Sequence, residues 1–264
     1  MRLTVIGCSG SMSGPDSASS CYLLQAEGPG EDGASRTWNI LLDLGSGAFG
    51  ALLGHLDPAE LDAVVLSHLH ADHVVDMTGL EVYRRYNPAG PLGPVPVLGP
   101  AGTAERIAAL TMEEDLSALD ASFSFIEHDP DRTVTVGPFR IDVAPVDHPV
   151  PAFGVRVTGP AEGGTGDVVL TYSGDTDACD RLVELATGAD LFLCEAAFQE
   201  GRDTVRGIHL TGRRAGETAA KAGAQRLLLT HMPPWNDPEQ VRAEAAEVYG
   251  GPIELARPSA GWVL

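Results

Sequence analysis

The chain has 264 residues, of which 44% are hydrophobic and 20% charged, and its formal net charge is −20. This composition is that of a soluble globular protein, and we expect one domain over residues 1–264. The acidity argues against a long polyanion as partner, because proteins that grip nucleic acid usually present a basic patch. No apolar run is long enough to cross a bilayer, so we expect no membrane partner. The first residues are too quickly polar for a secretory signal, so we expect a cytoplasmic protein.

Strands predominate in the first part of the chain. Apolar and β-branched runs predict strands over residues 2–7, 21–26, 38–44 and 61–67. A helix is predicted over residues 72–86, where the Pro-rich sequence from Pro88 to Pro100 breaks it, and another helix over residues 101–110.

Strands and helices alternate in the second part. The expected strands are residues 140–146, 153–158, 168–173, 191–194 and 226–230. The expected helices are residues 178–186, 212–222 and 238–249, with Thr211 as the N-cap of the second. This order predicts an α/β fold in which helices cover two sheets.

The stretch from Ser67 to His73 is rich in metal-ligand residue types. His68 and His70 follow a predicted strand, and in extended backbone their spacing points both side chains the same way. Asp72 and His73 come at the turn into the next helix. Three imidazoles and a carboxylate this close together suit a cation such as zinc.

Three later strand ends offer the same ligand types. His148, Asp175 and His231 each come just after a predicted strand. Any one of them alone could be a polar residue that caps a turn. Following the cluster at Ser67 to His73, they instead indicate a shared metal site. His55 and His128 lie in polar loops, and we leave them out of that site.

These residues resemble the metallo-β-lactamase superfamily, and within it the ribonuclease Z group. The likeness rests on the H-x-H-x-D-H pattern, on the Ser-Gly-Asp-Thr around Asp175 and on the Thr-His that ends at His231. It also includes residues 147–154, 194–198 and 209–211, and it extends from about residue 3 to 235. The resemblance implies a four-layer αββα sandwich of the metallo-β-lactamase fold.

The resemblance also implies two divalent metal ions, with zinc expected first and manganese or iron as alternatives. The ligands of one ion would be His68, His70 and His148. The ligands of the other would be Asp72, His73 and His231, and Asp175 would bridge the two ions. Asp43 matches a family residue that hydrogen-bonds the ligand loop, with a turn-capping role as the alternative.

The resemblance implies hydrolysis of a phosphodiester. Two divalent ions would lower the pKa of a shared water and so supply a bridging hydroxide as the nucleophile. We expect Asp72, Glu195 and His209 to be the catalytic residues. His209 is the candidate general acid for the leaving group, and Glu195 would poise it. The alternative for His209 is a solvated residue at the start of a helix.

The substrate is expected to be small. Ribonuclease Z carries a tRNA-gripping arm between the positions of His148 and Asp175, but only 26 residues separate them here. The turn over residues 159–167 contains no Lys or Arg. Arm-less relatives include cyclic nucleotide phosphodiesterases, so a 3′,5′-cyclic nucleotide such as cAMP is the expected substrate. Phe153 or Trp235 could stack on its base, with core packing as the alternative.

Other readings remain open. The protein could be a ribonuclease acting on tRNA 3′ ends, a metallo-hydrolase of a thioester or lactone, or a metal-binding scaffold without catalysis. Residues 83–86 could touch phosphate, form a solvated helix end, or form a dimer face as the corresponding region does in relatives. We expect a homodimer.

Overall fold

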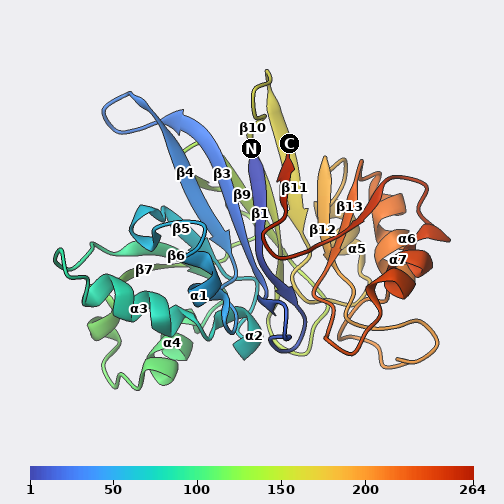
Figure 1. Cartoon of the computed structure of the whole chain (residues 1–264), viewed down its shortest axis with the longest axis horizontal. Coiled ribbons are helices and arrows are strands. Elements are labelled where there is room, and N and C mark those ends of the chain that lie inside the picture. Colours follow the sequence, from blue (N-terminus) through green and yellow to red (C-terminus); the bar gives the residue numbers. More distant parts are fainter.

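The computed structural model describes residues 1–264, with two β-sheets packed face to face between outer helices (Figure 1). The first sheet has the strand order β15-β1-β3-β4-β5-β6-β7, and β2 pairs with β1. Its strands are β1 (Arg2–Ser9), β2 (Ala18–Ser19), β3 (Cys21–Pro29), β4 (Ser35–Leu42), β5 (Ala63–Val65), β6 (Val95–Gly99), β7 (Phe123–Glu127) and β15 (Gly261–Val263).

All strands of the second sheet lie in the second half of the chain, and their order is β14-β13-β12-β11-β10-β9-β8. Its strands are β8 (Val134–Val136), β9 (Phe139–Pro145), β10 (Phe153–Pro160), β11 (Asp167–Tyr172), β12 (Leu191–Glu195), β13 (Leu227–Thr230) and β14 (Ile253–Leu255). Strands β8 to β11 are joined antiparallel, whereas β11 to β14 are parallel.

Helices form the two outer layers (Figure 1). The first sheet is covered by α1 (Ala48–Leu52), α2 (Ala71–Val74), α3 (Met77–Arg85) and α4 (Thr103–Thr111), with short 3-10 turns at Pro58–Glu60 and Leu116–Leu119. The second is covered by α5 (Asp180–Leu185), α6 (Gly212–Ala222) and α7 (Pro238–Ala246). The αββα order confirms the fold expected from the sequence. None of the helices is both long and apolar enough to cross a membrane.

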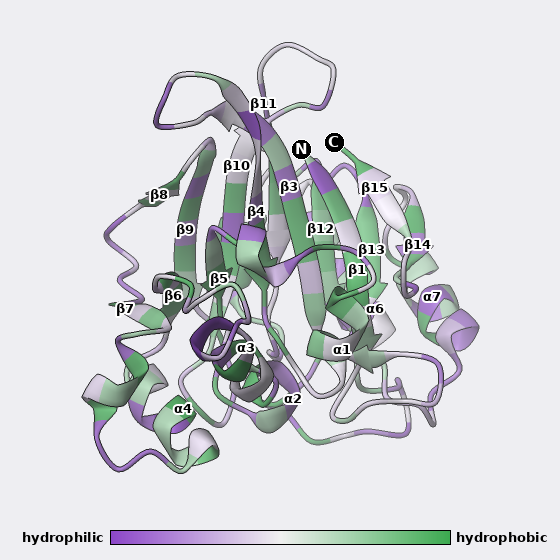
Figure 2. Cartoon of the chain, turned by 60° about the vertical axis from the view of Figure 1, so that its left-hand side comes forward, coloured by the Kyte–Doolittle hydropathy of each residue, from purple (hydrophilic) through white to green (hydrophobic).

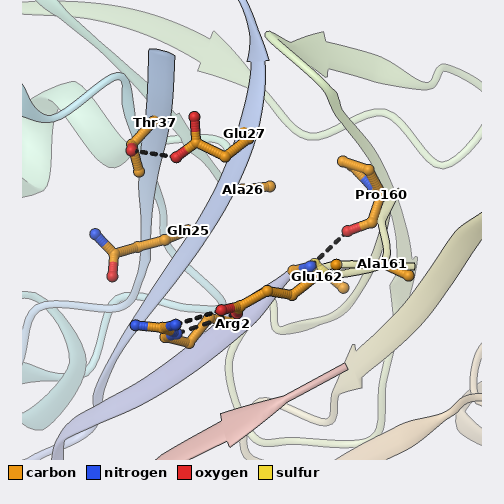
Figure 3. Close-up of a pocket in the computed structure, with 10 residues that line it drawn as sticks. Arg2, Gln25, Ala26, Glu27, Thr37, Pro160, Ala161 and Glu162 are labelled. Carbon is orange, nitrogen blue, oxygen red and sulfur yellow. Dashed lines mark hydrogen bonds and ion pairs between the residues drawn. The ribbon is translucent and has the colours of Figure 1, made fainter. Parts of the chain in front are cut away.

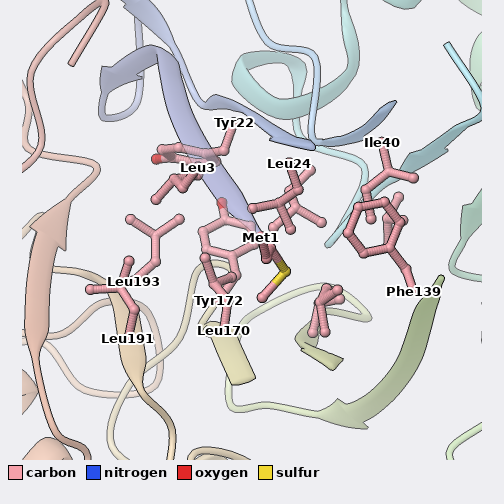
Figure 4. Close-up of a cluster of buried hydrophobic side chains, with 14 of the residues drawn as sticks. Met1, Leu3, Tyr22, Leu24, Ile40, Phe139, Leu170, Tyr172, Leu191 and Leu193 are labelled. Carbon is pink, nitrogen blue, oxygen red and sulfur yellow. The ribbon is translucent and has the colours of Figure 1, made fainter. Parts of the chain in front are cut away.

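Three apolar clusters hold the four layers together. The first lies between the sheets, where Leu3 and Leu24 face Leu170 and Leu193 (Figure 4). The other two lie between each sheet and its helices. Hydrophobic residues accordingly follow the strands, while hydrophilic residues gather in loops and on outer helix faces (Figure 2). Burying each large apolar side chain contributes about 1.5–3 kcal/mol, so these interfaces stabilise the sandwich.

One edge of the sandwich collects strand ends from both sheets. β4 and β5 are parallel, so the residues after them emerge together. β11, β12 and β13 are also parallel to one another. β9 runs in the same direction as β11, because β9 and β11 are each antiparallel to β10. Loops that follow the carboxyl ends of such strands commonly carry functional groups.

The predicted elements differ from the structure in a few places. The expected break from Pro88 to Pro100 contains β6, and the strand tolerates Pro96 because its pairing with β5 begins only at Val97. The helix expected over residues 72–86 is divided into α2 and α3. Strands β2, β7, β8, β14 and β15 were not predicted; four of these five have only two or three residues, too few to show a period.

Candidate metal centre

Strand β5 delivers the first ligands. The chain leaves it at Leu66; His68, before α2, and His73, within α2, are both fully buried. Nε2 of His68 lies 3.0 Å from Nδ1 of His70, so the two rings converge on one point as their spacing predicts. His148, after β9, adds its Nε2 at 3.1 Å from the same Nδ1 of His70.

Asp175 joins this group to a second one. Its Oδ2 lies 3.7 Å from Nε2 of His68 and 3.2 Å from Nε2 of His231. Its Oδ1 lies 3.2 Å from Nε2 of His73, which is itself 3.4 Å from Oδ2 of Asp72. Two groups of candidate ligand atoms therefore share Asp175: one contains His68, His70 and His148, and the other contains Asp72, His73 and His231.

The unpaired atoms of these residues fit divalent cations. Oδ2 of Asp72, Nε2 of His73 and Oδ1 of Asp175 are buried and make no hydrogen bond. Such atoms are costly unless a further partner satisfies them. With Zn–N distances of about 2.0–2.1 Å, tetrahedral ligands lie about 3.3 Å apart, close to the separations found here. All ligand atoms within each group lie within 4.8 Å of one another.

The outer nitrogens of four histidines face hydrogen-bond partners. Nδ1 of His148 lies 2.8 Å from the carbonyl oxygen of Ile208, to which it donates. The matching partners are Ser67 Oγ for His68, Asp43 Oδ2 for His73 and Ser20 Oγ for His231. A proton held on Nδ1 leaves the inward Nε2 free to bind a cation.

Asp43 holds the ligand loop in place. It is fully buried at a positive φ of 59° directly after β4. Its Oδ1 accepts the backbone N–H of Ser67 at 2.7 Å, and its Oδ2 accepts from Ser67 Oγ, His73 Nδ1 and the hydroxyl of Tyr172 at 2.7–2.8 Å. The expected contact between this aspartate and the ligand loop is therefore present.

A glycine permits close approach of the β4 turn to the ligand loop. A Cβ atom on Gly45 would lie 1.9 Å from the carbonyl oxygen of Asp72, a distance no real Cβ adopts. The N–H of Leu44, its neighbour, donates to the carbonyl of His73 at 2.8 Å. The turn therefore fixes the backbone of α2 as well as its side chains.

Charge within the centre favours cation binding. Burial lowers the pKa values of His68, His70 and His148, which keeps these rings neutral and able to act as ligands. Burial would likewise lower the pKa of His73, but the carboxylates of Asp175 and Asp43 outweigh it and raise this pKa. A divalent cation between His73 and Asp175 would replace that proton.

Glu195 and His209 form a pair beside both groups. Glu195 ends β12 fully buried, and its Oε1 accepts from Nδ1 of His209 at 2.8 Å. The ring of His209 lies 5.6 Å from the rings of both His148 and His231, one from each ligand group. Burial lowers the pKa of His209, but the Glu195 carboxylate outweighs it and raises the pKa to about 9. The Nδ1–Glu195 bond leaves Nε2 as the free proton donor of His209.

A hollow at the other end of the sandwich takes no part in this centre. It has a volume of about 300 Å³ and is lined by residues such as Gln25 and Thr37 (Figure 3). The amine of Met1 donates to the carbonyl of Pro160 there, at 2.5 Å. Its lining contains no histidine.

Several predicted residues have other surroundings than expected. His128 lies in the polar loop after β7, as expected, but its side chain turns inward: its Nε2 bonds the carbonyl of Leu66 at 2.9 Å, and burial lowers its pKa to about 4. Phe153 stacks on His128 and packs against the core. Trp235 is 60% exposed, so core packing is wrong for it.

The segment over residues 83–86 is engaged within the chain. The guanidinium of Arg84 is buried on the carbonyl of Gly93, and Arg85 pairs with Glu81 and Glu113. Both arginines therefore have partners within the chain, which argues against the phosphate contact that was one of three alternatives for this segment. Tyr86 remains 66% exposed.

The sequence did not point to Ser20, Tyr172 or Asp177, which support the site from outside. Ser20 and Tyr172 carry no ligand chemistry of their own, so no local signal distinguished them. Asp177 lies two residues after Asp175, in the sequence Asp-Thr-Asp, and this repeat of an acidic residue was the available signal.

The fold and the two groups of ligand residues define a metallo-hydrolase of the metallo-β-lactamase fold. A family profile described as a beta-lactamase superfamily domain matches residues 38–232. The chain therefore belongs to the β-lactamase superfamily of metallo-hydrolases.

Curated relatives extend along nearly the whole chain. An uncharacterized protein of Mycobacterium tuberculosis is 44% identical over 255 residues, covering 96% of this chain and 88% of the relative. The probable metallo-hydrolase YhfI of Bacillus subtilis is 31% identical and covers 99% of both chains. Ribonuclease Z of Mycobacterium bovis is 33% identical, covering 97% of this chain and 95% of its own.

Solved structures confirm the fold. The crystal structure of YhfI from Bacillus subtilis superposes with a TM-score of 0.84 at 30% identity, covering 99% of this chain and 98% of that one. Unliganded yeast PDE1 has a TM-score of 0.71 at 11% identity, covering 100% of this chain and 99% of that one. At that identity the likeness concerns the fold alone.

Proposed function

We propose that the protein is a binuclear metal-dependent phosphodiesterase. The observation that carries this proposal is the position of His209, whose ring lies equally close to a histidine of each ligand group. His68, His70 and His148 would hold one ion; Asp72, His73 and His231 would hold the other, with Asp175 between them. Two bound divalent ions supply a water nucleophile at neutral pH and neutralise charge on phosphate oxygens.

The chain's own residues would handle the leaving group. The Glu195 carboxylate raises the pKa of His209 to about 9, which favours the protonated ring at neutral pH. Its side chain is 12% exposed, so a substrate at the ligand groups can reach the free Nε2. His209 would then donate a proton to the departing alkoxide, and Glu195 would stabilise and orient its ring.

A small phosphodiester fits this site better than tRNA. The segment between His148 and Asp175 folds as the hairpin β10–β11, whose turn over residues 161–166 has no basic residue. The net charge of −20 opposes a long polyanion. A 3′,5′-cyclic nucleotide such as cAMP is our proposed substrate, with zinc as the first metal to test. The exposed ring of Trp235, four residues after His231, is the candidate surface for its base.

Ribonuclease activity is the second candidate. The 33% identity to ribonuclease Z of Mycobacterium bovis, over 97% of this chain, is the observation in its favour. A ribonuclease would need a binding surface for tRNA other than the short β10–β11 turn.

The test compares three substrates with the zinc-loaded protein: cAMP, bis(p-nitrophenyl) phosphate and a precursor tRNA. We expect hydrolysis of the first two. Cleavage of the tRNA alone would favour the ribonuclease, and no hydrolysis of any diester would reject the proposal in favour of a thioester or lactone. His209→Ala should slow turnover of cAMP by about 10²–10⁴-fold while the metal content stays at two ions.

We further propose that two copies associate through α3. Val82, in the last turn of α3, and Tyr86, the residue that caps its carboxyl end, are 53% and 66% exposed, and the N–H of Tyr86 donates to the carbonyl of Val82, so the two form one outward apolar patch. A second copy would cover this face. Val82→Glu should convert a dimer to a monomer in analytical ultracentrifugation, whereas Val263→Glu, at an equally exposed position on β15, should not. A monomeric wild-type protein would reject the dimer.

A further inference from the structure

A buried carboxylate outside the ligand set ties three segments of the site together. Asp177 is 1% exposed, and its backbone N–H donates to the carbonyl of Asp147, beside the ligand His148, at 2.8 Å. Its Oδ2 accepts from the backbone N–H of Gly207 at 2.8 Å. Its Oδ1 accepts from Nη1 of Arg214, on α6, at 2.5 Å.

The same guanidinium nitrogen of Arg214 also reaches the backbone of His209. Nη1 donates to the carbonyl oxygen of His209 at 3.1 Å, while Nε donates to Thr211 Oγ1 at 3.3 Å. The Arg214 side chain is only 11% exposed, so little water is available to replace these bonds. One donor therefore satisfies two acceptors, the carboxylate of Asp177 and the backbone carbonyl of His209, the candidate general acid.

Each residue of the segment 207–210 makes a backbone hydrogen bond to another part of the site. Gly207 donates to Asp177, Ile208 accepts from the ligand His148 at 2.8 Å, and His209 accepts from Arg214. The carbonyl of Leu210 accepts from the N–H of Phe198 at 2.9 Å. Arg214 is the one side chain of α6 in this set. Its removal leaves the bonds of Ile208 and Leu210 in place, while Asp177 keeps its pairing with Nε of Arg206 at 2.6 Å.

We propose that Arg214 and Asp177 form a clamp that positions His209 over both ligand groups and couples its loop to that of His148. Neither residue belongs to the two ligand groups, so both are positioning residues. The catalytic consequence rests on the proposed function, because it requires His209 to be the proton donor. A displacement of a catalytic group by about 1 Å can slow a reaction by about 10²-fold.

The test compares Arg214→Gln with Arg213→Gln. Arg213 is the preceding residue of α6, and its guanidinium pairs at the surface with Glu217 and Glu247. Two substrates distinguish a displaced His209 from general damage to the active site. The alkoxide leaving group of cAMP needs a proton, whereas the weakly basic p-nitrophenolate of bis(p-nitrophenyl) phosphate departs without one.

We expect Arg214→Gln to lower kcat on cAMP by about 30–100-fold and on bis(p-nitrophenyl) phosphate by less than about threefold. Metal content should be unchanged, and Arg214→Lys should recover part of the loss because an ammonium can donate to both acceptors. Arg213→Gln should behave as wild type. An equal loss on both substrates, or no loss on either, would overturn the clamp.

A second readout is independent of activity. Hydrogen–deuterium exchange over residues 206–211 of the metal-loaded protein should be faster in Arg214→Gln than in Arg213→Gln. If the wild-type protein hydrolyses no diester, the proposed function fails, and this exchange measurement alone decides the clamp. Unchanged exchange in Arg214→Gln would then reject it.

Discussion

Replacing Asp43 with Asn should weaken the second metal site without emptying the first. In the native site Oδ1 faces a fixed donor, the N–H of Ser67, and Oδ2 faces three donors from Ser67, His73 and Tyr172. An amide has only one acceptor oxygen. If its nitrogen takes the Oδ1 position, the N–H of Ser67 loses its partner.

If the nitrogen takes the Oδ2 position, the two hydroxyls can rotate and accept, but His73 cannot. His73 must then move its proton to Nε2, the atom that faces Asp72 and Asp175. Either arrangement leaves one buried donor unpaired or one ligand protonated, at a cost of about 1–3 kcal/mol. We therefore expect affinity for the second ion to fall about 10–100-fold, as for other partners of metal-bound histidines.

The measurement is a chelator competition for each ion, together with the metal content after dialysis. Asp62→Asn is the control, because Asp62 Oδ2 also accepts a backbone N–H, from Asn39 at 2.7 Å, but lies away from the centre. Asp43→Asn should lose affinity for one ion, and Asp62→Asn for neither. Wild-type affinity for both ions in Asp43→Asn would refute the reasoning.

Three further predictions address the site. Glu195→Gln should move the alkaline fall of kcat to lower pH, since the Glu195 carboxylate raises the pKa of His209 and the protonated ring is lost as pH rises through that pKa; an unmoved pH profile would contradict this. Gly45→Ala should lower the melting temperature strongly and reduce metal content because of the contact with Asp72, whereas Gly50→Ala, in α1 with open space around it, should stabilise by about 0.5–1 kcal/mol. Trp235→Ala should raise KM for cAMP but not for bis(p-nitrophenyl) phosphate, and an equal effect on both would remove Trp235 from base binding.

The sequence predicts the position of the site well because its ligands obey local rules. His68 and His70 converge because side chains two residues apart in extended backbone share a side. Asp175 and His231 meet because parallel strands end at one edge of a sheet. These relations depend on strand direction and residue spacing, both of which can be read from the chain.

The supporting contacts could not be predicted in the same way. Ser20 reaches Nδ1 of His231 across the two sheets, and Tyr172 reaches Asp43 from the second sheet to the first. The carbonyl of Ile208 that orients His148 carries no side-chain information at all. Such partners depend on how the sheets pack, which residue spacing does not encode. The short strands β8, β14 and β15 could not be predicted for a related reason: they are strands because they pair with neighbouring strands, and their own sequences are too short to show a pattern.

The division of the ligands between the two sheets makes a bound ion a cross-link. His73 comes after strand β5 of the first sheet, and His231 comes after strand β13 of the second. The chain between these two residues is more than half of the molecule. A bond that closes so long a loop restricts the unfolded chain; for a disulfide the entropy removed corresponds to about 4–5 kcal/mol. The early ligands alone provide only part of either group, so a growing chain would capture ions tightly only after its last ligand has folded into place. Metal occupancy would then report complete folding and would hold the two sheets together at one edge, where no disulfide joins them.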